Sequence, residues 1–437
     1  MLHADCPPPG KTTRIRCTGP ATFLTSTVRW TYLATAATFA PHRSTCLPRR
    51  DGPALGMPRS LLFTFLRRML LWTLVGLVLA IGALVVLLQQ PVFGATAQGE
   101  RLERIHASPN FRNGAFQNRR FTPQLAEGYT MPGLLWEFIF SDPPRRMPTG
   151  AIPTQKHDLH ALPPGDLLVW FGHSSYLLRI DGRTILVDPV LSGRVAPMPG
   201  FGKAFPGTDR YTVDDLPPID LLLITHDHYD HLDHAVVEAL RPKVAEVVCG
   251  LGVGAHMERW GYAPELVRET DWHETLTVAG GLVLHTVPAR HFSGRGLKRD
   301  NTLWQSYVLD AGGRKFFLGG DSGHDTHFAE AGAAHGPFEL AILECGQYDV
   351  RWKYIHLLPE EVVTAAQELG AQRLFPVHNS KFPLANHPWD EPLTKVSAFA
   401  EAAGLPLLTP MIGEVVQLAD STRMNVHWWE GVDGAAP

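Results

Sequence analysis

The sequence predicts an α/β domain built of two β-sheets covered by helices, preceded by a single membrane helix. Two observations predict the domain: short β-rich runs joined by tight turns come first, and strand-like runs alternate with helical stretches afterwards. A third predicts the membrane helix, namely an uncharged apolar run of 20 residues. The chain has 437 residues, of which 45% are hydrophobic and 19% charged, so its composition excludes a disordered or fibrous protein.

Residues 1–56 form the first segment and are expected to be an unstructured leader. They are rich in Pro, Thr, Arg and Cys and show no hydrophobic periodicity. A more conventional start follows at Met57-Pro58-Arg59-Ser60. We therefore hypothesise that residues 1–56 are not part of the natural chain, which would begin near Met57.

Residues 57–97 are expected to form a signal anchor, with the membrane segment at residues 69–88. The length of this apolar run matches the hydrocarbon core of a bilayer. Three arginines just before it place the N-terminus in the cytoplasm and the catalytic domain on the non-cytoplasmic side, which is the periplasm if the cell is bacterial. A cleaved signal peptide is the alternative, because Ala95-Thr96-Ala97 offers a small-x-small cleavage site.

Residues 98–165 read as a polar lead-in that packs on the main domain. One apolar patch, Leu134 to Phe140, interrupts them. We expect this patch to be a satellite core cluster, and a position near the membrane surface is the alternative.

Residues 166–437 form the main domain. Asp181-Gly182 predicts a hairpin turn between two of its strands. Strands are expected at 167–171, 176–180, 184–187, 221–224, 246–249, 282–287, 304–309, 315–318, 340–343 and 374–377. Helices are expected near 234–241, 359–369 and 391–403.

Charge and histidine are concentrated in the C-terminal part of the chain. The whole chain has a net charge of −4, so it lacks the excess of basic residues that is typical of nucleic-acid-binding proteins. Residues 151–437 hold 22 basic and 36 acidic residues and 18 of the 21 histidines. The five cysteines form no CxxC pair, so a metal site would have to use His and Asp.

The segment Thr225-His226-Asp227-His228-Tyr229-Asp230-His231 is the strongest chemical signal. It follows the apolar strand at 221–224 directly, and a strand end is a rigid place from which several ligands reach one point. His226 and His228 are two residues apart, so in an extended segment both imidazoles leave on the same side. Asp230 and His231 follow a turn, which lets them reach a second point nearby. Asp233 is expected to cap the helix that begins near His234.

Further metal-binding side chains follow other strands. Two metals need roughly six to eight protein ligands, so the four from this loop are too few. His291, Asp321 and His378 each follow an apolar run at or near its end. The series predicts that these three side chains join the loop in a two-metal site.

This arrangement resembles the metallo-β-lactamase superfamily, whose first motif is HxHxDH, over about residues 165–415. The resemblance implies a four-layered αβ/βα sandwich and two Zn²⁺ ions as cofactors. It implies that one zinc is held by His226, His228 and His291, the other by Asp230, His231 and His378, and that Asp321 bridges the two.

Within the superfamily, the flanking segments are most similar to the N-acyl-phosphatidylethanolamine-hydrolysing phospholipase D family and its bacterial relatives. The segments that carry this similarity are Trp170 to Ser175, Thr184 to Pro189, Pro288 to His291, Phe317 to Gly323, and Tyr354 to His356. The similarity implies that His356 lies beside the metals or faces the phosphate. His173 is expected either to orient a zinc ligand through a hydrogen bond or to satisfy a turn.

One departure from these relatives concerns the last zinc histidine. Many relatives follow it with Trp-Gly-Thr, whereas His378 is followed by Asn379-Ser380-Lys381. We therefore expect a different wall beside the second zinc, which leaves the exact substrate open but does not affect the metal site.

The predicted function is a membrane-tethered, zinc-dependent hydrolase of the phospholipase D type. A hydroxide bridging two cations would attack a phosphodiester, and N-acyl-phosphatidylethanolamine would give N-acylethanolamine and phosphatidic acid. Asp230, Asp321 and His356 are the candidate catalytic residues. The tether would present membrane lipids at high effective concentration.

Two other functions remain open at this point. One is a lactonase or another hydrolase of the same fold acting on a soluble substrate. The other is a metal-binding protein without enzymatic activity. We expect a phospholipid substrate and the membrane as partners and no nucleic acid, and we leave a homodimer open.

Overall fold

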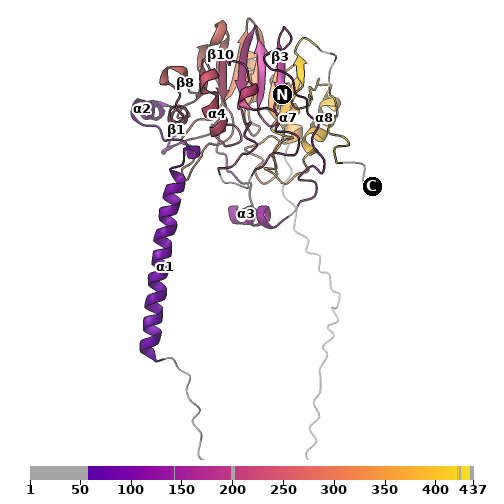
Figure 1. The fold of residues 1–437 in the computed structure, drawn as a ribbon. Helices are drawn as coiled ribbons and strands as arrows, with labels where there is room; N and C mark the ends of the chain where they lie inside the picture. Colours follow the sequence, from indigo (N-terminus) through magenta and orange to yellow (C-terminus); the bar gives the residue numbers. More distant parts are fainter. Residues whose placement is uncertain (1–57, 142, 198–201, 421, 423–424, 434–437) are drawn as a thin grey trace, which may run out of the picture. The chain divides into compact units, whose positions relative to one another are not determined.

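The computed structural model of the protein describes residues 58–141, 143–197, 202–420, 422 and 425–433 (Figure 1). The chain divides into two units, residues 1–72 and residues 73–437, so the boundary falls inside the first helix. The leader expected at residues 1–56 lies outside the described residues.

Helix α1, Arg59–Leu88, contains the predicted membrane segment and begins ten residues before it. From Met69 onward it has no charged residue, and its large apolar side chains are exposed. By length and composition it is long and apolar enough to cross a membrane.

Two β-sheets form the frame of the second unit. In the described part of the chain, the first holds, in spatial order, β15 (Val415–Gln417), β3 (Leu167–Trp170), β4 (Tyr176–Ile180), β5 (Arg183–Val187), β6 (Leu221–Ile224), β7 (Val247–Gly250) and β8 (Val267–Thr270). The second holds β14 (Leu374–Val377), β13 (Leu340–Glu344), β12 (Arg314–Leu318), β11 (Ser306–Ala311), β10 (Val283–Val287) and β9 (Thr275–Thr277). Each sheet begins with antiparallel hairpins and continues with parallel strands, which is the order that the sequence predicts.

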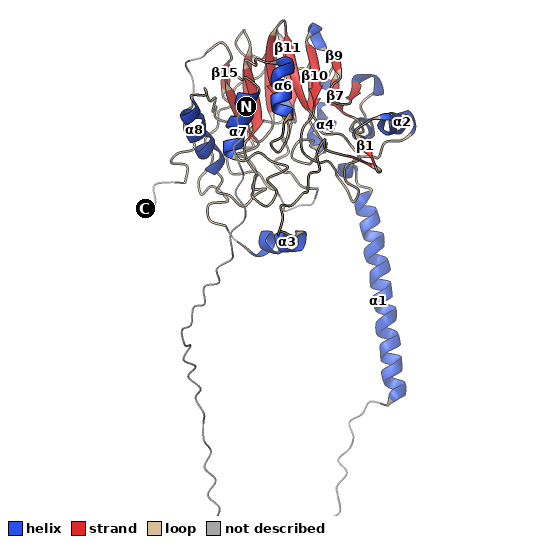
Figure 2. Cartoon of the chain, turned by 180° about the vertical axis from the view of Figure 1, so that it is seen from behind, coloured by secondary structure: helices blue, strands red, loops and turns tan. Residues whose placement is uncertain are grey.

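Helices cover the outer face of each sheet. The helices of this unit after α1 are α2 (Gly99–Ala107), α3 (Met131–Phe140), α4 (His234–Leu240), α5 (Gly254–Arg259), α6 (His327–His335), α7 (Pro359–Glu368) and α8 (Glu391–Ala403). Helices α4 and α5 share an apolar core with the first sheet, and α6, α7 and α8 share one with the second. Figures 1 and 2 show this unit from opposite sides.

A third core lies between the two sheets and follows from strand periodicity. In β6, Leu221 and Leu223 pack between the sheets, while Leu222 and Ile224 pack against the helices. Because both faces of the strand are buried, its sequence is a continuous apolar run rather than an alternating one. The expected four-layered αβ/βα sandwich is therefore confirmed.

Local signals in the sequence explain two of the connections. Asp181 and Gly182 both have positive φ, 49° and 75°, as a two-residue turn between β4 and β5 requires. Asp233 caps α4 as predicted, because its carboxylate accepts hydrogen bonds from the amides of Ala235 and Val236. The turn reverses the chain from β4 into β5, and the cap starts α4 directly after the ligand loop.

The lead-in, residues 98–165, packs on the main domain only in part. Ile105 of α2 and Phe116 of β2 (Ala115–Phe116), which pairs with β1 (Phe111–Arg112), are buried in a cluster with Trp304. The expectation of a satellite core cluster at Leu134 to Phe140 is wrong. These residues lie in α3, which has no buried residue.

Candidate metal centre and its cavity

The predicted ligands all leave the carboxyl ends of strands, or the loops that follow them. Strand β6 leads into the loop of residues 225–231, and β10, β12 and β14 are followed by His291, Asp321 and His378. The parallel strands β12, β13 and β14 of the second sheet end at the same edge. This shared edge brings side chains distant in sequence to one place.

The first group consists of His226, His228, His291 and Asp321, whose ligand atoms all lie within 4.8 Å of one another. His228 Nδ1 lies 2.9 Å from His226 Nε2 and 3.2 Å from His291 Nε2. Asp321 Oδ2 is 3.9 Å from His226 Nε2 and 3.7 Å from His291 Nε2. Three imidazoles and one carboxylate oxygen thus surround one point, which suits a single divalent cation.

The second group consists of His173, Asp230, His231 and His378, again within 4.8 Å. Asp230 Oδ2 lies 3.7 Å from His231 Nε2 and 3.8 Å from His378 Nε2. The other oxygen of Asp321, Oδ1, lies 3.1 Å from His231 Nε2. Asp321 therefore faces both groups, one oxygen to each, as a bridging ligand would.

His173 lies in a turn and also contacts the second group. Its Nε2 is 3.0 Å from Asp230 Oδ2, and its ring centroid is 4.1 Å from that of His378. Burial lowers its pKa to about 3, so the ring is neutral and donates to the Asp230 carboxylate. This contact is the orienting hydrogen bond that the sequence suggested for His173.

Hydrogen bonds to the remote nitrogens fix the orientation of the ligand imidazoles. Asp188 Oδ2 accepts from His231 Nδ1 at 2.8 Å and from Thr225 Oγ1 at 2.6 Å. Thr225 Oγ1 also lies 3.0 Å from His226 Nδ1, and the carbonyl of Ile355 is 2.8 Å from His291 Nδ1. The Nε2 atoms of these three histidines are therefore left for a metal.

The charge state of the first group suits a cation. Burial lowers the pKa of His226 and His291 well below the ordinary imidazole value and that of His228 to about 4. Burial alone would raise the pKa of Asp321, but His231 and His378 outweigh it and hold that pKa well below its usual value. The group thus offers neutral nitrogen lone pairs and an ionised carboxylate, which are the forms that bind a metal.

Two unsatisfied buried atoms test the fit of a metal. His231 Nε2 and Asp321 Oδ1 are buried and lie 3.1 Å apart, but neither has a hydrogen bond of good geometry. Burial opposes protonation of His231, but the carboxylates of Asp321 and Asp230 outweigh it and raise its pKa well above the ordinary value. The space between these side chains therefore favours a positive charge. Buried polar atoms without partners are uncommon in proteins, and a cation would satisfy both. The residues therefore fit a two-metal centre.

Strained backbone accompanies the site. His173, Asp188 and His378 have φ values of 55°, 41° and 67°, which lie in the left-handed region. Such values are uncommon for residues other than glycine and concentrate at functional sites. A turn of this kind, located after a strand, orients each of the three side chains.

His356 lies beside the centre and is held by an acidic partner. Its Nδ1 is 2.6 Å from Glu344 Oε2 and 4.0 Å from Asp321 Oδ2. Burial opposes protonation of His356, but Glu344 outweighs it and raises its pKa to about 9. Glu344 also accepts from the amide of Ser322 at 2.6 Å, which ties the pair to the residue next to Asp321.

The side chains of Asn379 and Lys381, which follow His378, do not line the cavity. Asn379 Nδ2 donates to the carbonyls of Cys345 and Val377, and Lys381 Nζ donates to the carbonyls of Phe171 and Val190. Both side chains are buried and hold loops together. The wall comes instead from residues further along, Leu384 and Asn386.

A cavity of about 360 Å³ opens onto the centre. Its polar floor is formed by His228, Asp230, His291, Asp321, His356 and His378. Its apolar wall is formed by Leu125, Met131, Leu134, Leu135, Phe138, Phe292, Trp352, Ile355 and Leu384. The cavity can thus hold an apolar chain with a polar group at the metals.

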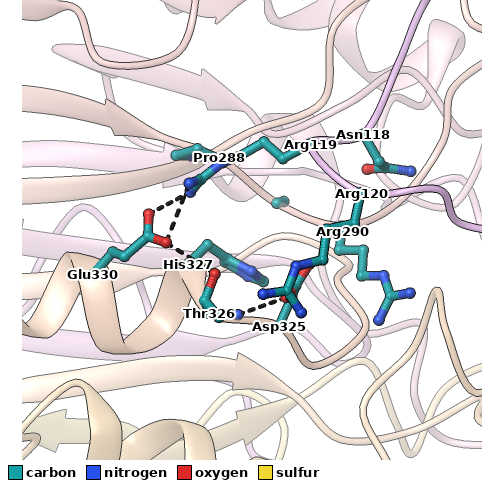
Figure 3. Close-up of a pocket in the computed structure, with 10 residues that line it drawn as sticks. Asn118, Arg119, Arg120, Pro288, Arg290, Asp325, Thr326, His327 and Glu330 are labelled. Atoms are coloured by element: carbon teal, nitrogen blue, oxygen red, sulfur yellow. Dashed lines mark hydrogen bonds and ion pairs between the residues drawn. The ribbon is translucent and has the colours of Figure 1, made fainter.

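A separate polar hollow of about 310 Å³ is lined by Pro288 and Arg290, which precede His291 in the chain (Figure 3). Two of its three arginines form ion pairs, Arg119 with Glu330 of α6 and Arg120 with Asp325, and Arg290 donates hydrogen bonds to Thr122 Oγ1 and the carbonyl of His324. Asn118 lines it and clamps the backbone of His291, donating to its carbonyl at 2.7 Å and accepting from its amide at 3.1 Å. The lead-in therefore positions one of the ligands.

Sequence reasoning missed Asp188, Glu344 and Asn118. Asp188 and Glu344 stand at the ends of β5 and β13, so the strand-end rule that found the ligands applies to them too. Asn118 lies in the irregular lead-in, and no local pattern marks it.

The hydrogen bonds of Asp188 predict a measurable effect on metal binding. In Asp188→Asn, an amide replaces the carboxylate that accepts from Thr225 and His231, so His231 is held less firmly. We expect metal affinity to fall about 10- to 100-fold, measured by competition with a chromogenic chelator. Asp310→Asn on β11 is the matched control, and equal affinities in the two variants would contradict the assignment.

Comparison with known proteins agrees with this geometry. Residues 183–379 match the family described as beta-lactamase superfamily domain. An uncharacterized protein of Mycobacterium tuberculosis, Rv0906, is 38% identical over 331 residues, covering 74% of this chain and 87% of that protein. N-acyl-phosphatidylethanolamine-hydrolyzing phospholipase D 1 of Caenorhabditis elegans is 29% identical over 279 residues, covering 59% of this chain and 77% of that protein.

A second relative bears a similar name. The mitochondrial N-acyl-phosphatidylethanolamine-hydrolyzing phospholipase D of Saccharomyces cerevisiae is 31% identical over 250 residues, covering 54% of this chain and 52% of that protein. Together with the sandwich and the ligand groups, these matches show that the chain belongs to the metallo-β-lactamase superfamily and is a metal-dependent hydrolase.

Proposed function

We propose that the protein is a membrane-tethered dinuclear zinc phosphodiesterase of the phospholipase D type. Its substrate is N-acyl-phosphatidylethanolamine, and its products are N-acylethanolamine and phosphatidic acid. The observation that carries this proposal is the cavity, in which an apolar wall meets a floor of metal ligands. A phospholipid has this same combination of an apolar chain and a phosphodiester.

The names of two relatives support the choice of substrate. The worm and yeast proteins are both named as hydrolysing N-acyl-phosphatidylethanolamine. Both align with more than half of this chain.

The two ligand groups would hold the metals. His226, His228 and His291 would hold one Zn²⁺, and Asp230, His231 and His378 the other, with Asp321 shared between them. Two bound Zn²⁺ ions supply Lewis acidity at the phosphoryl group and ionise water near neutral pH. The chain's own part is to fix the spacing of the groups and, by burial, to keep His226, His228 and His291 unprotonated.

His356 supplies a positive charge at the cavity floor. Because Glu344 keeps it protonated at neutral pH, its imidazolium stabilises the negative charge that develops on the phosphoryl oxygens or the leaving oxygen. Glu344 acts through His356 as a positioning residue. The wall residues bind the acyl chain and exclude water from the floor.

The tether supports the choice of a lipid substrate. Helix α1 has the length and composition of a membrane span, and a spanning α1 would hold the enzyme at the bilayer. We propose that the catalytic domain lies on the non-cytoplasmic side, because arginines precede the apolar run.

A paired substrate assay tests the proposal. The full chain in mixed micelles is expected to release N-acylethanolamine from N-acyl-phosphatidylethanolamine, to lose this activity to a chelator and to regain it with Zn²⁺. Asp321→Ala removes the carboxylate that faces both groups and is expected to abolish turnover. Mass spectrometry of the products and metal analysis of both proteins give the readouts.

The alternatives give different results in the same assay. Cleavage of lactones without cleavage of the lipid would show a hydrolase for soluble substrates. Metal binding without turnover of either substrate would show a metal-binding protein.

The pair of His356 and Glu344 predicts a pH effect. The pKa of His356 is raised to about 9, so the imidazolium is present below that pH and is lost as the pH rises through it. We expect His356→Gln to lower kcat about 10²- to 10⁴-fold. In Glu344→Gln, the alkaline limb of the kcat profile is expected to move to lower pH.

The pH profile is measured with a soluble phosphodiester such as bis(p-nitrophenyl) phosphate. Glu368→Gln serves as the control, because Glu368 pairs with His324 outside the cavity. An alkaline limb that stays in place in Glu344→Gln would exclude the proposed role of Glu344.

A further inference from the structure

Helix α3 exposes an unusual amount of apolar side chain. Its sequence is MPGLLWEFIF, with Glu137 as its one charged residue. Leu135, Trp136, Ile139 and Phe140 are 58–67% exposed, and the rings of Trp136 and Phe140 lie 4.3 Å apart. A contiguous apolar surface of this kind marks an interaction site in a soluble domain.

The helix is held in place rather than loosely attached. Glu137 forms an ion pair with Arg351, which is buried and also pairs with Asp349. On another side, the guanidinium of Arg146 lies 4.3 Å from the ring centroid of Phe138. These contacts fix α3 to the domain and leave Trp136, Ile139 and Phe140 largely exposed.

The same helix forms part of the wall of the metal cavity. Met131, Leu134, Leu135 and Phe138 line the cavity together with the ligands on its floor. Leu135 both lines the cavity and is 60% exposed, so one apolar surface continues from the outside of α3 to the metal centre. In both views of the unit, α3 lies among the loops at one edge of the sandwich, away from the helices that cover the sheets (Figures 1 and 2).

The segment that follows α1 is fixed at this edge of the domain. Arg295 Nε donates to the carbonyl of Val92, and its Nη1 donates to the carbonyl of Asp227 in the ligand loop. Trp260 Nε1 donates to the carbonyl of Pro91, and the ring of Phe93 lies edge-on against Tyr229 of the same loop. If α1 spans a bilayer, the folded domain that follows it therefore begins beside the loop of residues 225–231.

We propose that α3 lies in the interfacial layer of a lipid bilayer, with Trp136, Ile139 and Phe140 among the acyl chains. A helix with an apolar outer face and aromatic residues suits this layer, where it lies in the plane of the membrane. The cavity mouth then opens directly onto the lipid. The further step, that an acyl chain passes along Leu135 into the cavity, rests on the proposed function.

A second copy of the chain could also cover α3. The anchor and the cavity favour lipid, because a partner helix on α3 would close the mouth through which substrate enters. The experiments below separate the two occupants.

Fluorescence quenching tests the position of α3 without any assay of activity. The full chain, with Cys6, Cys17 and Cys46 changed to serine, carries one added cysteine, Ile139→Cys, labelled with an environment-sensitive dye; Cys249 and Cys345 are buried. The protein is reconstituted in phosphatidylcholine vesicles that contain brominated lipid. The control is Phe399→Cys on α8, at a residue 41% exposed.

We expect strong quenching of the dye at position 139 and none at position 399. Equal quenching at both positions, or none at 139, would overturn the proposal. Cross-linking of two Ile139→Cys chains through the added thiol without quenching would assign the surface to a second copy and would overturn it as well.

A second experiment separates membrane docking from catalysis. The variant Trp136→Glu/Ile139→Glu changes two side chains outside the cavity lining, and Phe399→Glu is its control. We expect at least a 10-fold loss of hydrolysis of vesicle-embedded N-acyl-phosphatidylethanolamine, with hydrolysis of bis(p-nitrophenyl) phosphate within twofold of the parent. Equal loss on both substrates, or on neither, would overturn the role of α3 in lipid access.

The two proposals can fail separately. If the parent cleaves neither substrate, the proposed function fails, and the quenching at position 139 still decides where α3 lies.

Discussion

The carboxylate of Asp188 joins the ends of two parallel strands to the metal loop, and the geometry of the site depends on it. It accepts from the backbone amide and the hydroxyl of Thr225 and from the imidazole of His231. Strand β5 ends just before Asp188, and β6 ends just before Thr225. The register between β5 and β6 is thereby transmitted to the ligand nitrogens, and a slip of one residue would reverse which side chains face the metals.

The loops of the second sheet approach those of the first closely, so that the predicted ligands from both sheets converge. A Cβ on Gly320 would lie 2.6 Å from the Cβ of Thr225, so only glycine allows the loop before Asp321 to approach this closely. Gly346 similarly leaves room for the carbonyl of His378, which a Cβ would meet at 2.1 Å. These two close approaches lie next to predicted ligands that must converge, Asp321 and His378.

The sequence predicted the parts of the structure that depend on local pattern. Strands 176–180, 221–224 and 374–377 have the predicted bounds, because apolar runs buried on both faces are unambiguous when turns flank them. The clustering of the predicted ligands was predictable because strand ends position side chains by topology alone. The apolar patch at Leu134 to Phe140 was misassigned, because sequence shows that a segment avoids water but not whether protein or lipid covers it.

The predicted ligands and the apolar wall of the cavity come from different parts of the chain. The matched family covers residues 183–379, which hold the seven predicted ligands and also Asp188 and Glu344. Much of the apolar wall comes from outside this range, from Leu125 and α3 before it and from Leu384 after it. The domain is acidic, with 36 acidic against 22 basic residues in 151–437, so attraction of an anionic headgroup must come from the floor itself. The family's core would then supply the chemistry, while the lead-in decides which molecules reach it.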